Sequence, residues 1–110
     1  MSPATLIVLT TCGNADDATA VAEALVERRL AACVNTVGGV TSVYRWRGRV
    51  ERDQETLLII KTTAERFVEV EKAIHELSKY ELPEVLALPV TAGSARYLDW
   101  LRESSTEIKD

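Results

Sequence analysis

The sequence predicts an α+β domain: a ferredoxin-like antiparallel sheet with helices on one face and an additional C-terminal helix. Strand-like and helical patterns follow one another in the order β-α-β-β-α-β before a last helical segment. Only one connection, at residues 47–49, is short enough for a hairpin, so the other two connections are helical crossovers. With 110 residues, the chain has room for one core. We therefore expect residues 1–110 to form a single domain.

The N-terminal part predicts a strand followed by a helix. Residues 6–11 are mostly apolar and β-prone, and Asn14 is a suitable N-cap for a helix over residues 15–29. Asp16 and Asp17 lie in its first turn, where the helix dipole favours negative charge. The apolar stripe of this helix consists of Ala18, Val21, Ala22 and Leu25.

Two long strands are predicted next, at residues 32–46 and 50–61, joined by the hairpin turn at 47–49. Gly38 and Gly39 interrupt the first of them. No helix start follows these glycines, so they do not form a phosphate-binding loop. A β-bulge or kink explains them better.

The second half predicts a helix, a strand and a closing helix. Thr62 and Glu65 have the spacing of a capping box, in which each side chain satisfies a free backbone N–H of the other residue. A last strand is expected at residues 85–90 and a short helix at 94–102. The first of these helices carries Phe67, Val70, Ile74 and Leu77 on one face, and the second carries Tyr97, Trp100 and Leu101.

Residues 57–60 are apolar in succession, so both faces of their strand require burial. The two long helices cover only one face of the sheet. Burial of each such side chain stabilises a fold by about 1.5–3 kcal/mol. Another subunit is the favoured cover for the second face, and the alternative is that the terminal helix folds across it.

The composition argues against several classes of protein. A net charge of −4 and a pI near 5.0 argue against a nucleic-acid partner, which a basic face would normally bind. The apolar run at residues 6–9 is too short for a membrane span or a signal sequence, so we expect no membrane partner and a cytoplasmic location. Cys12 and Cys33 fit neither a disulfide scaffold nor a zinc site with paired spacing.

The predicted topology sorts the polar residues between two ends of the sheet. Cys33, Lys61 and the last helix gather at one end, which excludes a Cys12–Cys33 disulfide within the chain. The candidate site residues share the opposite rim: Cys12, Tyr44, Trp46, His75, Tyr80, Glu81 and Glu84.

Cys12 and His75 are candidate ligands for copper or another divalent cation, because thiolate and imidazole suit copper and zinc. The alternative is a buried or strand-end cysteine and a surface histidine. Glu81 and Glu84 flank Pro83 on a turn that ends the second helix, and they either hold a ligand or only solvate that turn.

No nucleophile, second base or oxyanion-binding set accompanies the two glutamates, so we expect no enzyme. The aromatic side chains either stack on a planar ligand or anchor an interface between subunits. They are Tyr44, Trp46, Tyr97 and Trp100.

Several segments, in their order and spacing, closely resemble the divalent-cation tolerance protein family CutA over essentially the whole chain. They are residues 27–35 (ERRLAACVN), 41–48 (TSVYRWRG), Glu55 with 61–63 (KTT), 80–84 (YELPE) and 97–101 (YLDWL). The resemblance implies a ferredoxin-like subunit, a compact homotrimer similar to the PII signalling proteins, and a link to copper and other divalent metals. It also implies a cytoplasmic bacterial or archaeal setting.

The chain departs from this family at one motif. Ser78 and Lys79 stand where many members have histidine and proline, and Thr10 aligns best with a copper-binding cysteine of some members. No complete ligand set is therefore carried over. Two functions remain: metal binding at Cys12 with carboxylates or His75, and a trimeric signalling or scaffold module. The module would bind a small anion or a partner protein in clefts between subunits, through Tyr44, Trp46, Lys61, Tyr80 and Glu84.

Overall fold

The computed structural model describes residues 3–107 and confirms the predicted fold class. The elements are β1 (Thr5–Cys12), α1 (Ala15–Glu27), β2 (Cys33–Trp46), β3 (Arg49–Thr63), a 3₁₀ turn (Ala64–Arg66), α2 (Phe67–Leu77), β4 (Leu86–Pro89) and α3 (Ala95–Ser104). No helix in this part of the chain is long and apolar enough to cross a membrane.

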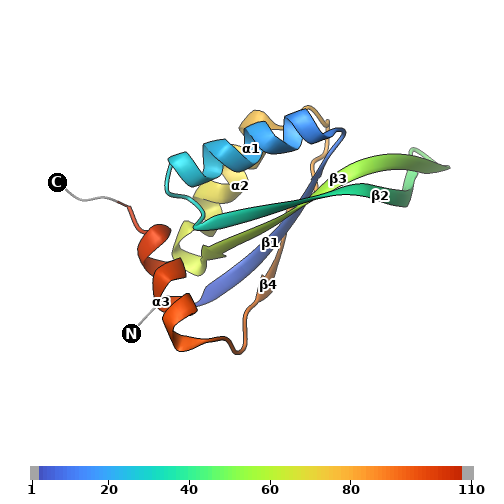
Figure 1. The fold of residues 1–110 in the computed structure, drawn as a ribbon. Coiled ribbons are helices and arrows are strands. Elements are labelled where there is room, and N and C mark those ends of the chain that lie inside the picture. Colours follow the sequence, from blue (N-terminus) through green and yellow to red (C-terminus); the bar gives the residue numbers. More distant parts are fainter. Residues whose placement is uncertain (1–2, 108–110) are drawn as a thin grey trace.

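The sheet has the strand order β2-β3-β1-β4, and each neighbouring pair is antiparallel. Helices α1 and α2 lie side by side over one face, and α3 lies near the start of β1 (Figure 1). The core lies between this helix layer and the sheet. There Val8, Leu58 and Ile60 pack against Leu25 of α1 and Ile74 of α2, and all five side chains are buried.

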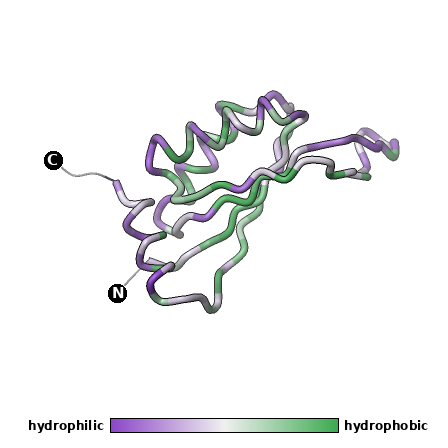
Figure 2. Tube along the Cα trace, viewed as in Figure 1, coloured by the Kyte–Doolittle hydropathy of each residue, from purple (hydrophilic) through white to green (hydrophobic). Residues whose placement is uncertain are grey.

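The opposite face of the sheet, called here the open face, remains largely uncovered. Leu86 pairs with Leu9 and Leu88 pairs with Ile7, so these four residues share that face. Leu86 is 59% exposed and Leu88 is 47% exposed. Figure 2 shows hydrophobic residues along β1 and β4. Helix α3 contacts β1 and β3 but does not bury these leucines, so the alternative of a full cover by the terminal helix is wrong.

Beyond the main sheet, β2 and β3 continue as a projecting hairpin, the arm (residues 40–55) (Figure 1). A register shift between Val37 and Val40 confirms the predicted β-bulge, and Gly39 has a φ of +72°. Arg47 and Gly48 form the two-residue turn with φ of 51° and 80°. Positive φ at both positions is typical of a type I′ turn, whose twist matches that of the strands.

Helix α1 begins where the sequence predicts and ends two residues earlier. Asn14 caps α1 as predicted, since its Oδ1 accepts from Asp17 N at 2.8 Å. The helix ends at Glu27 rather than at residue 29 because Arg29 has left-handed backbone geometry, with a φ of 58°.

The predicted capping box at Thr62 and Glu65 is wrong. β3 extends through Thr63, so the strand ladder with β1 holds both threonines, and α2 starts only after the 3₁₀ turn. Thr62 Oγ1 instead donates to the Leu30 carbonyl at 2.6 Å in a buried position. The threonine therefore ties β3 to the loop after α1 rather than starting a helix.

The buried hydrogen bond from Thr62 to the Leu30 carbonyl should contribute to the stability of the fold. Thr62→Val keeps the side-chain shape but leaves the buried Leu30 carbonyl without its partner, which should cost about 1–3 kcal/mol of unfolding free energy in denaturant titration. Glu65→Ala is the matched control. It should have an effect within about 0.5 kcal/mol, because Glu65 is an exposed residue. A functioning capping box would give the Glu65 variant a clear cost as well.

Candidate functional site

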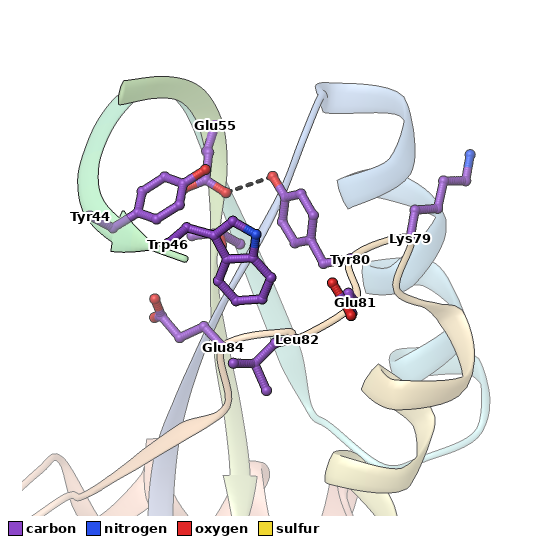
Figure 3. Close-up of a pocket in the computed structure, with 9 residues that line it drawn as sticks. Tyr44, Trp46, Glu55, Lys79, Tyr80, Glu81, Leu82 and Glu84 are labelled. Carbon is purple, nitrogen blue, oxygen red and sulfur yellow. Dashed lines mark hydrogen bonds between the residues drawn. The ribbon is translucent and has the colours of Figure 1, made fainter. Parts of the chain in front are cut away.

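A cavity of about 360 Å³ lies where the arm meets the end of β1 and the turn between α2 and β4 (Figure 3). We call it the arm pocket. Its wall combines aromatic and acidic side chains with a threonine, a lysine and a leucine, from three parts of the chain that are distant in sequence. The lining residues are Thr11, Tyr44, Trp46, Glu55, Lys79, Tyr80, Glu81, Leu82 and Glu84.

The turn after α2 has a defined shape. Ser78 leaves the helix with extended backbone, and its Oγ accepts from Tyr80 N at 3.0 Å. Pro83 is buried beneath the turn and fixes its own φ. Ser78 and Pro83 thus place Tyr80, Glu81 and the residue after the proline, Glu84, on the pocket wall.

Two phenol groups of the site donate to carboxylates of β3. Tyr80 Oη donates to Glu55 Oε2 at 2.6 Å, and Tyr44 Oη donates to Asp53. The hydrogen bond to Asp53 raises the pKa of Tyr44 to about 12. Burial, and then the bond to Glu55, raises the pKa of Tyr80 as well. Both phenols therefore stay neutral at ordinary pH and act as hydrogen-bond donors to these two side chains.

The cationic side chains near the pocket are paired. Arg47 Nη2 donates to Glu81 Oε2 at 2.8 Å and to Oε1 at 3.1 Å, while its guanidinium carbon lies 5.3 Å from the centroid of the Trp46 ring. Lys79 points away from the aromatic rings (Figure 3) and donates to Asp17 at 2.9 Å. That bond raises the pKa of Lys79 and lowers the pKa of Asp17. The interior of the pocket is therefore predominantly acidic.

Cys12 and His75 do not line a common cavity. Cys12 borders a cavity of about 20 Å³ that also has Tyr80 in its wall. Burial, followed by the charges of Asp17 and Glu55, raises the pKa of the Cys12 thiol. His75 is exposed on α2, with Nε2 3.9 Å from Glu71 Oε2. Within residues 3–107, no three His, Cys, Asp or Glu side chains are grouped to hold a metal ion.

Lys61 and the aromatic pair of α3 lie outside the arm pocket. Lys61 is the cross-strand neighbour of Cys33, and its Nζ lies 3.8 Å from Cys33 Sγ and also donates to Asn35. Tyr97 and Trp100 contact each other on α3, with ring centroids 5.3 Å apart. Both cysteines are free, in agreement with the excluded disulfide.

Sequence reasoning placed five of the lining residues on one rim, and the structure brings them together: Tyr44, Trp46, Tyr80, Glu81 and Glu84. It missed the other four lining residues, which are Thr11, Glu55, Lys79 and Leu82. Glu55 pairs with Val40 just after the bulge. A signal for it exists in the sequence, since it lies two positions before Leu57 and therefore shares the open face.

Comparison with known proteins identifies the family. The model of the family described as "CutA1 divalent ion tolerance protein" matches residues 6–104. The divalent-cation tolerance protein CutA of Thermus thermophilus is 50% identical over 99 residues, which cover 90% of this chain and 96% of that protein. Human Protein CutA is 41% identical over 100 residues. The match covers 91% of this chain but only 56% of the human protein, so the chain spans about half the length of that relative.

Solved structures agree with the sequence matches. The Thermus thermophilus divalent cation tolerance protein superposes with a TM-score of 0.91 at 48% identity, covering 93% of this chain and 99% of that one. CutA1 from Oryza sativa superposes with a TM-score of 0.93 at 37% identity, covering 97% and 98% of the two chains. The chain therefore belongs to the CutA1 family of divalent ion tolerance proteins.

Proposed function

We propose that this CutA protein serves divalent-cation tolerance as a homotrimer without enzymatic activity, and that it binds a ligand in the arm pocket. The observation that carries the proposal is the pocket itself, a cavity of about 360 Å³ with three aromatic rings in its wall. Cavities of this size, with an apolar wall and a few fixed polar groups, are typical of small-molecule sites.

The polar groups of the pocket support binding rather than catalysis. Glu55 accepts a hydrogen bond from Tyr80, and Glu81 is held by Arg47. A catalytic pair would need a nucleophile hydrogen-bonded to a base. The described lining residues offer Thr11 as the only aliphatic hydroxyl, and no hydrogen bond joins it to a carboxylate among them.

The open face and the arm support the trimer. The open face exposes Leu86 and Leu88, while Val43 and Val50 of the arm are 57% and 68% exposed. Each chain thus carries two different surfaces with exposed apolar side chains, as a head-to-tail contact between identical subunits requires. Three copies, each placing its arm against the next subunit, would close a ring and leave no open face uncovered.

The trimer can be tested by charge insertion. Leu88→Glu places a carboxylate on the open face and should convert the assembly to monomers with a mass near the 12.1 kDa of one chain. Sedimentation equilibrium measures the mass. Val68→Glu, at an exposed position of α2 on the helix layer, is the control and should keep three times that mass. A wild-type protein that is monomeric at micromolar concentration would contradict the trimer.

The role of the arm pocket can be tested in cells. In a strain without its own CutA whose growth is inhibited by copper, the wild-type chain should restore growth and Trp46→Ala should not, because the main aromatic wall is lost. Trp100→Ala makes the same change on α3, outside the pocket, and should restore growth. Both variants must first be shown to be folded and trimeric. Full rescue by Trp46→Ala would refute the pocket as the functional site.

Copper or another divalent cation at Cys12 is a second candidate function. It is favoured by the acidic surroundings of the thiol, since Asp17 and Glu55 both act on it. The names of relatives also refer to divalent cations. A bound soft cation would replace the thiol proton and offset the negative charge of Asp17 and Glu55.

Calorimetric titration tests this second candidate. Cu²⁺ added to the metal-free, reduced protein should release heat, and Cys12→Ala should weaken the affinity by at least about tenfold, as expected for loss of a principal ligand. Cys33→Ala is the matched control, because Cys33 lies at the other end of the sheet beside Lys61. Equal affinities of the wild type and the Cys12 variant would exclude the site.

A further inference from the structure

The charges around the arm pocket determine which ligands it can accept. Glu55, Glu81 and Glu84 all line the cavity, and Asp53 accepts a hydrogen bond from the lining residue Tyr44. Lys79 is the one basic residue among the described lining residues, and its ammonium group is directed to Asp17. An anion would therefore meet carboxylates without a free cation to balance them, whereas a cation would be attracted.

The hydrogen-bonding groups of the pocket agree with this polarity. Tyr44 and Tyr80 both use their hydroxyl protons on carboxylates of β3. They therefore present oxygen lone pairs and ring faces to a ligand rather than donors. The negative face of an aromatic ring attracts cations, and tryptophan does so most strongly.

The protein's own Arg47 illustrates the recognition that this wall provides. Its guanidinium lies against the ring of Trp46 and at the same time donates twice to Glu81. Both Arg47 and Glu81 are about 70% exposed, so the pair is not locked in place by burial. A ligand cation could therefore use the same ring and carboxylate, in competition with Arg47.

We infer that the arm pocket selects a small organic cation, with an alkylammonium or guanidinium group that binds between Trp46 and the carboxylates of Glu81 and Glu84. This inference rests on the proposed function, because it takes the arm pocket to be the binding site. A bare metal ion needs several convergent ligands, and residues 3–107 hold no group of three such side chains. An organic cation needs only a π face and nearby negative charge.

A set of probes with the same shape and different charge tests the inference. Choline, 3,3-dimethyl-1-butanol and 3,3-dimethylbutanoate are cationic, neutral and anionic, and ethylguanidinium supplies the planar cation. Binding is followed by Trp46 fluorescence in a Trp100→Phe background at constant ionic strength. We expect choline or ethylguanidinium to bind about tenfold more tightly than the neutral and anionic probes.

Charge changes in the pocket should alter the affinity for the cation in opposite directions. Arg47→Gln removes the internal competitor and one positive charge, so it should tighten binding of the cation by about threefold. Arg96→Gln removes the same charge at an exposed position of α3, outside the pocket, and is the matched control, with little change expected. Glu84→Gln should weaken binding of the cation. If Arg47→Gln instead weakens it, the inference is refuted.

The failure of this inference can be told apart from failure of the proposed function. If the neutral probe binds as tightly as choline, and a crystal structure places it beside Trp46, the pocket remains a binding site and only its preference for cations is refuted. If no probe binds, the inference is refuted. Growth rescue by Trp46→Ala then decides whether the proposed function is refuted too.

Discussion

Strand β3 carries apolar residues on both of its faces, while the chain provides only one layer of helices, and this constraint governs the rest of the structure. Leu58 and Ile60 enter the core under α1 and α2. Leu57 and Ile59 lie on the opposite face, where β1 separates them from the exposed leucines of β4. A single chain covers only one of these faces, so in the proposed trimer the stability of the subunit would be linked to assembly. The arm is a continuation of β3, so the pocket depends on the same strand as the core and the open face.

Most of the fold could be predicted from the sequence because its signals are periodic or tied to backbone geometry. The order of elements, the cap at Asn14 and the bulge at the two glycines follow from such signals. The capping box at Thr62 could not be judged in the same way. Its spacing is local, whereas the end of β3 is set by pairing with β1, and the ladder continues to Thr63.

Only the part of the candidate site that follows from strand order and direction could be predicted from the sequence. Strand direction places the hairpin and the turn after α2 at one end of the sheet, which brings Tyr44, Trp46 and Tyr80 together. Strand direction does not show which way a side chain points from a helix. His75 was therefore placed on the rim, whereas it lies exposed on α2, apart from Cys12. Nor does strand direction give the charge of the cavity, because the ion pairs of Arg47 and Lys79 depend on side-chain positions in three dimensions.

The bulge at Gly38 and Gly39 determines the orientation of the arm relative to the sheet. A bulge adds one residue to one strand and increases its local twist, so it sets the direction in which the following hairpin projects. Tyr44 and Trp46 reach the turn after α2 only because the arm leaves the sheet at that angle. The shape of the pocket therefore depends on two glycines that have no part in its wall. Sequence changes at this joint would change the shape of the pocket while every lining residue stays the same.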